Sequence, residues 1–157
     1  MDVQSETLLA QILRCARVAA LGTLRDDAPH VCMVEFIAAQ DFSSFHIFAS
    51  RLAPHIVDLQ KNKQASLLIA ETDDGRENPQ TLARVSIRGS AELMQNGEPG
   101  YTLIKSMFIK RFPESEVLFK LEDFGLWRIK PKGGRFVAGL AKAYNITPET
   151  LQKVSER

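Results

Sequence analysis

The sequence has few cysteines and no long apolar run, and each shortage excludes a class of protein. Its two cysteines, Cys15 and Cys32, form no CxxC pair and no Cys/His cluster with metal-ligand spacing, so we expect no metal site and two reduced, buried thiols. No stretch approaches the roughly 18 apolar residues of a membrane span. The apolar N-terminal stretch is interrupted by charges and lacks the order of a signal peptide, which predicts a cytoplasmic protein that does not engage a membrane.

An excess of positive charge is also missing. The chain carries 20 Lys and Arg against 19 Asp and Glu, a net charge of +1, which argues against a dedicated nucleic-acid binder. No GxGxxG or GxxxxGK[ST] motif is present, and no Ser-His-Asp or Cys-His arrangement can be assembled. We therefore expect no catalytic residue of the protein itself, so that any catalysis belongs to a bound cofactor. A length of 157 residues suits a single domain over 1–157.

Period-2 alternation is the strongest signal that the sequence does contain. Between Leu82 and Met94, apolar residues alternate with charged and hydroxyl residues, as expected for a strand with one buried face. Turn residues at 25–29, 40–44 and 131–134 separate further short runs of strand character. The predicted strands are 18–24, 30–38, 45–49, 65–70, 82–94, 124–129 and 135–138, with an exposed loop at 71–80.

Helices are predicted between and outside these strands. Ser5 is expected to cap a helix that ends at Cys15, and Thr147 followed by Pro148 is expected to start a C-terminal helix. Two more helices are predicted at 54–61 and 99–111. Short strands joined mostly by hairpins, with helices between them, indicate a mainly β protein built as an antiparallel barrel with peripheral helices.

Several segments, in order and spacing, resemble one known family. They are Cys32-Met-Val-Glu-Phe36, Phe45-His-Ile-Phe-Ala-Ser50, Leu52-Ala-Pro-His55 and Ala83-Arg-Val-Ser-Ile-Arg-Gly89. Together they are similar to the pyridoxamine 5'-phosphate oxidase-like FMN-binding split barrels, and within them to the haem-utilisation (HugZ-type) branch, over roughly residues 8 to 151. The resemblance implies a six-stranded antiparallel split barrel, a homodimer with FMN held between its subunits, and a flavin-dependent oxidoreductase acting on a small molecule.

The resemblance also implies a set of cofactor contacts. Backbone on one strand would flank the flavin, the end of the next would meet the ribityl phosphate, and basic groups would neutralise it. An aromatic side chain could stack on the cofactor from the partner, although a core position is the commoner role for such a residue. In order, these residues are Met33, Val34 and Glu35; Ala49 and Ser50; Arg51, His55 and Arg84; and Trp127. Ser50 could equally cap the following helix.

Two departures from the family pattern bear on function. Pyridoxamine phosphate oxidases begin the flavin strand with Arg and end it with Lys, where this chain has Cys32 and Ile37. Their Ser-Arg-Lys phosphate motif is replaced here by Ala53, Pro54 and His55. These changes favour another activity than pyridoxamine phosphate oxidation. The alternatives are a haem-binding or haem-degrading protein on the same fold, and a dimeric binding module without a cofactor.

Overall fold

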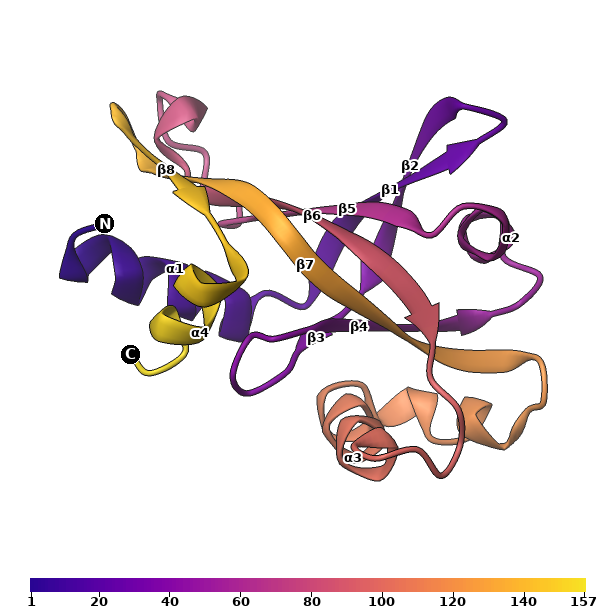
Figure 1. Ribbon diagram of the computed structural model, residues 1–157. Helices are drawn as coiled ribbons and strands as arrows, with labels where there is room; N and C mark the ends of the chain where they lie inside the picture. The colour runs from indigo at the N-terminus through magenta and orange to yellow at the C-terminus, as the bar shows by residue number, and fades with distance from the viewer.

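The protein is built on one antiparallel sheet with helices at its ends and on part of one face (Figure 1). The computed structural model describes all 157 residues. The strands are β1 (Val18–Arg25), β2 (Ala28–Glu35), β3 (Ile37–Ala38), β4 (Phe45–Ser50), β5 (Gln64–Ala70), β6 (Arg84–Leu93), β7 (Phe124–Gly139) and β8 (Lys142–Ile146). The helices are α1 (Val3–Cys15), α2 (Pro54–Lys61), α3 (Tyr101–Arg111) and α4 (Pro148–Val154), with 3₁₀ turns at Pro79–Thr81, Pro113–Ser115 and Leu118–Lys120. No helix is long and apolar enough to cross a membrane.

The sheet curls into a barrel that stays open along one seam. Its strand order is β2-β1-β5-β6-β7-β4-β3, with β8 added to β7. β2 and β4 approach each other without pairing, so the predicted split barrel is confirmed. Eight strands are present instead of the six that the resemblance implies. The expected strand at 30–38 breaks at Phe36, whose N–H donates to the Arg17 carbonyl, the strands expected at 124–129 and 135–138 form the single strand β7, and β8 was not foreseen.

The turn predicted at 131–134 is wrong, because β7 runs unbroken through it. Gly133 pairs with Arg88 and Gly134 with Ile87 on β6, next to a register shift at Arg88/Gly89. A Cβ on Gly134 would lie 2.1 Å from the Ser86 carbonyl oxygen. Glycine is therefore required here by the close approach of two strands, and not by a turn.

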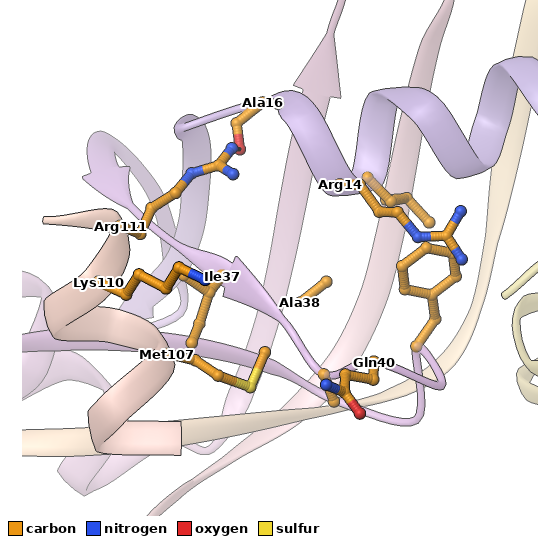
Figure 2. Close-up of a pocket in the computed structure, with 11 residues that line it drawn as sticks. Arg14, Ala16, Ile37, Ala38, Gln40, Met107, Lys110 and Arg111 are labelled. Carbon is orange, nitrogen blue, oxygen red and sulfur yellow. Dashed lines mark hydrogen bonds between the residues drawn. The ribbon is translucent and has the colours of Figure 1, made fainter. Parts of the chain in front are cut away.

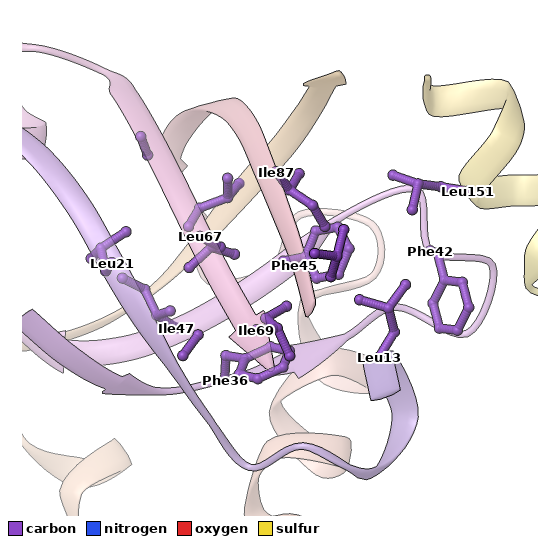
Figure 3. Packing of buried hydrophobic residues seen from close by; sticks show 14 of the residues in the cluster. Leu13, Leu21, Phe36, Phe42, Phe45, Ile47, Leu67, Ile69, Ile87 and Leu151 are labelled. Atoms are coloured by element: carbon purple, nitrogen blue, oxygen red, sulfur yellow. The ribbon is translucent and has the colours of Figure 1, made fainter. Parts of the chain in front are cut away.

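The barrel interior is one continuous apolar core (Figure 3). Leu21, Leu67 and Ile87 project into it from neighbouring strands, while α1 and α4 close one end and α2 the other. The cap of α1 is Asp2, whose carboxylate accepts from the Ser5 N–H, so the predicted cap at Ser5 is wrong by three residues. Cys15 at the end of α1 is exposed rather than buried, and both thiols are free.

A second apolar layer covers only part of the outside of the sheet. α3 and the following 3₁₀ turns pack on β4 and β7, with Phe48 stacked on Phe119 at 3.8 Å between ring centroids. In Figure 1 these elements lie below β4 and β7, away from β1 and β2. The outer face of the β2–β1–β5–β6 half therefore has no helix over it.

We expect Gly134→Ala to lower the free energy of unfolding by about 3 kcal/mol, because backbone on β6 must move to admit the new methyl group. Urea denaturation would measure the change. Gly133→Ala is the matched control, since its Cβ would make an ordinary contact of 3.4 Å. Equal stability of the two variants would contradict the proposed close approach.

Candidate functional site

The uncovered outer face of β2, β1, β5 and β6 forms a surface that we call the outer floor. The strand registers place its residues in two rows that cross four neighbouring strands. One row is Val31, Gly22, Ser66 and Arg88, and the other is Met33, Ala20, Leu68 and Ser86. None of these eight residues is buried, whereas buried core residues such as Leu21, Leu67 and Ile87 alternate with them along β1, β5 and β6.

The outer floor combines exposed apolar side chains with a low centre. Val31 and Met33 are each 73% exposed and Leu68 is 46% exposed, which is unusual for large apolar residues that lie side by side on one sheet. Between them Ala20, Gly22 and Ser66 have small side chains or none. Such a surface is shaped to receive a flat group or a second sheet.

Cations border the outer floor on the β6–β7 side. The side chain of Arg88 makes no hydrogen bond and no ion pair. Arg88 lies roughly 14 Å from Val31, across three strand spacings. Arg135 donates only to the Asn145 side chain. The Arg84 side chain is not free to bind an anion, because its guanidinium donates to the Gln80 and Leu82 carbonyls. Arg88 is thus the cation that is free to meet an anion on this surface.

The residues predicted from the sequence divide between the two faces of the sheet. Met33, Glu35 and Arg84 lie on the outer face. The pKa of Glu35 is raised, first by partial burial and then by Glu114. Val34 and Trp127 point instead into the barrel core, where Trp127 is 5% exposed. In a single chain the indole is a core residue, and it is not available to stack on a cofactor at the outer floor.

A second group of predicted residues gathers where β4 leads into α2. Ser50 donates to the Asp123 carboxylate at 2.9 Å and accepts from the Leu52 N–H, so its hydroxyl caps this corner. Ala49 precedes it in β4, and the N–H of the exposed Arg51 donates to the Asp123 carbonyl. The Asp123 carboxylate would repel a phosphate placed at Ser50.

His55 follows Pro54 in the first turn of α2 and is half buried. Its Nε2 is shielded from water and has no hydrogen-bond partner. Burial lowers the pKa of His55, with Asp58 opposing the shift. Asp58 itself is buried and accepts from Thr23 at 2.8 Å and from Arg25 at 2.8 Å, an arrangement that lowers its pKa and fastens α2 to β1.

The remaining histidines do not form a metal centre. His46 is buried beneath α3 with its Nε2 2.9 Å from the Ser44 hydroxyl, whereas His30 is exposed on β2. Partial burial raises the pKa of the Cys32 thiol, which lies on β2 as His30 does. No group of three or more His, Cys, Asp or Glu side chains is arranged to hold a metal ion.

Sequence reasoning missed most of the outer floor. The mostly apolar composition of segment 65–70 predicts a strand but does not indicate that Ser66 and Leu68 alternate with buried neighbours on an open face. The signal that could have found the floor is the alternation of small with large residues in β1, where Ala20 and Gly22 flank the buried Leu21. Arg88 lies four residues after the predicted Arg84 on the same face of β6.

The chain is similar in sequence to one protein family and to two haem oxygenases. A family model described as "Pyridoxamine 5'-phosphate oxidase" matches residues 6–138. The chain is 30% identical over 130 residues to the chloroplastic haem oxygenase HOZ of Arabidopsis thaliana, covering 83% of this chain and 38% of that protein. It is 26% identical over 140 residues to the haem oxygenase HutZ of Vibrio cholerae, covering 88% of this chain and 76% of that protein.

A solved structure shares the fold over nearly the whole chain. It is the haem-binding protein from Mycobacterium smegmatis, with a TM-score of 0.85 and 19% identity, covering 98% of this chain and 62% of that one. The chain thus spans well under half the length of the plant relative and about three fifths of this structure.

We expect the buried His46 to make stability depend on pH. Burial, reinforced by Arg128, lowers its pKa from 6.5 to about 4, so below pH 6.5 the unfolded chain binds a proton that the folded chain does not. Stability is then lost as the pH falls from about 6.5 to about 4, by about 3 kcal/mol in total. Urea denaturation across this range would show a flatter dependence for His46→Gln than for the wild type.

His55→Gln is the comparison variant, because the lowered pKa of this half-buried side chain predicts a smaller effect of the same sign. An unchanged pH dependence in His46→Gln would contradict the assignment.

Proposed function

Since the chain belongs to the pyridoxamine 5'-phosphate oxidase family, we propose that it is a homodimeric haem-binding protein whose cofactor lies on the outer floor. The observation that carries the proposal is the exposed apolar surface of Val31, Met33 and Leu68 beside the unpaired Arg88. Haem has a flat apolar ring and two carboxylates. The floor offers a complementary surface for the ring, and Arg88 a charge-assisted partner for a carboxylate.

The second copy of the chain completes the groove in this proposal. An exposed apolar sheet face of this kind is typical of a protein–protein contact. A partner sheet packed over part of the floor would shield some of its large apolar side chains and leave the others lining a cleft beside Arg88. Of the side-chain types that hold haem iron, only Met33 lies on the floor itself. The names of the two haem oxygenases above support the same cofactor.

FMN is the second candidate for this family fold. The observation in its favour is the start of α2, where the helix has no side-chain cap and Arg51 makes no ion pair, so that a phosphate could accept from free N–H groups. Asp123 disfavours a phosphate here, because its carboxylate already accepts the hydrogen bond of the Ser50 hydroxyl. Arg84, the other predicted phosphate contact, is committed to backbone carbonyls. These contacts favour haem over FMN.

In either case the protein's part in catalysis is binding and orientation. A bound haem or flavin supplies the redox chemistry, and the residues around it determine its access and electrostatics. The proposed activity is therefore oxidoreduction of the cofactor itself or of a small molecule held beside it, without a protein nucleophile.

The first test is titration of the purified protein with haemin and, separately, with FMN. We expect a saturable Soret band with haemin, a dissociation constant raised about tenfold in Arg88→Gln by loss of a charge-assisted contact, and no saturable flavin signal. Lys61→Gln, which removes an exposed cation on α2, is the control and should bind as the wild type does. Saturable binding of FMN alone would make the second candidate correct.

The second test concerns the homodimer. We expect sedimentation to give a dimer for the wild type and a monomer for Leu68→Glu, because the new charge would be buried between two apolar floors. Circular dichroism should be unchanged, since Leu68 is outside the barrel core. Leu103→Glu, at a 55% exposed position on α3, is the control and should remain dimeric. A monomeric wild type would rule out the shared groove.

If both titrations fail while the dimer persists, the protein is the cofactor-free binding module considered above.

A further inference from the structure

A groove of about 560 Å³ lies between α1, α3 and the segment that follows β3 (Figure 2). Its volume is within the range of small-molecule sites. Apolar side chains make most of its lining, among them Ile37, Ala38 and Met107. None of the residues proposed above to contact haem or FMN takes part in it. We call it the α1–α3 groove.

All the charged groups in the lining are cations. Lys110 and Arg111 come from α3, and Arg14 comes from α1 on the opposite side, with the apolar strip between them (Figure 2). Gln40 is the one neutral polar side chain. None of the three cations lies within 4.0 Å of an Asp or Glu carboxylate, whereas Arg25, Arg76, Arg128 and Arg157 each form an ion pair. An apolar groove with unneutralised positive charge selects for a ligand with an apolar body and an acidic group.

Two of these cations are held in place by the fold. Arg111 donates to the Cys15 and Ala16 carbonyls at the C-terminal end of α1. Its Nε, however, is shielded from water and has no hydrogen-bond partner. Arg14 lies over the Phe42 ring at 5.0 Å, and its two amino groups donate to the main-chain oxygens of Arg157 and Ser155, so that it contributes its field and no free donor. A buried donor without a partner is uncommon in folded proteins. Lys110, by contrast, is exposed and makes no hydrogen bond or ion pair, so its ammonium group can reach a ligand.

We propose that the α1–α3 groove binds a small amphipathic carboxylate such as a medium-chain fatty acid. The hydrocarbon chain would lie along Ile37, Ala38 and Met107, where burial of apolar surface stabilises the complex. The carboxylate would lie at the cationic edge and accept from Lys110, in the field of Arg111 and Arg14. The site is separate from the outer floor, so its occupancy does not depend on haem or FMN.

Titration of the ¹⁵N-labelled full chain with decanoate tests this proposal. We expect saturable shifts confined to the amides of 13–16, 37–42 and 107–111, with weaker binding of decan-1-ol because it lacks the charge. Lys110→Gln should raise the dissociation constant of decanoate about tenfold. Ala38→Phe, which fills the groove without touching the cations, should abolish binding.

The control is Lys61→Gln, which removes an exposed cation remote from the groove and should bind decanoate as the wild type does. Three results would overturn the proposal: no saturation with decanoate, wild-type affinity in Lys110→Gln, or shifts that map to the outer floor. Displacement of decanoate by one equivalent of haemin would also overturn it, because the two ligands would then share one site.

Discussion

The pairing of β7 with β6 is the constraint on which the rest of the structure depends. Ten residue pairs join the two strands, and β7 also carries β4 and β8. Because Gly134 admits the β6 backbone closely, β7 can run on through a segment that would otherwise turn. Its length lets one part of the sheet carry α3 on its outer face while the other part stays bare. The outer floor is the consequence of that division.

The distribution of charge separates structural from functional cations. Arg25 is paired with the buried Asp58, and Arg128 with both Glu92 and Glu98. These pairs hold neighbouring elements together and leave no charge for a ligand. Arg88 and Lys110 have no such partner, and each lies beside an exposed apolar surface. This combination is the shared basis of the two binding proposals, at two places in the fold.

The sequence predicted the strands well wherever alternation was regular, as in the segment from Leu82 to Met94, of which Arg84–Leu93 forms β6. It failed where a local signal had a non-local cause. The glycines at 133 and 134 suggested a turn, yet they serve strand packing, and Ser5 suggested a cap that Asp2 provides. For the site, the structure shows Met33 and Arg84 on one face of the sheet, but the hydrogen bonds from Arg84 to the Gln80 and Leu82 carbonyls could not be foreseen.

By itself the sequence determined the family and the antiparallel barrel, because alternation, turn residues and motif spacing are local properties of the chain. Only the tertiary structure decided which strand faces are covered and which cations are already paired. Those properties depend on contacts between segments far apart in the chain, such as Ser50 with Asp123 and α1 with α3 across the groove. Burial and pairing are properties of the packed molecule, so no local pattern reports them.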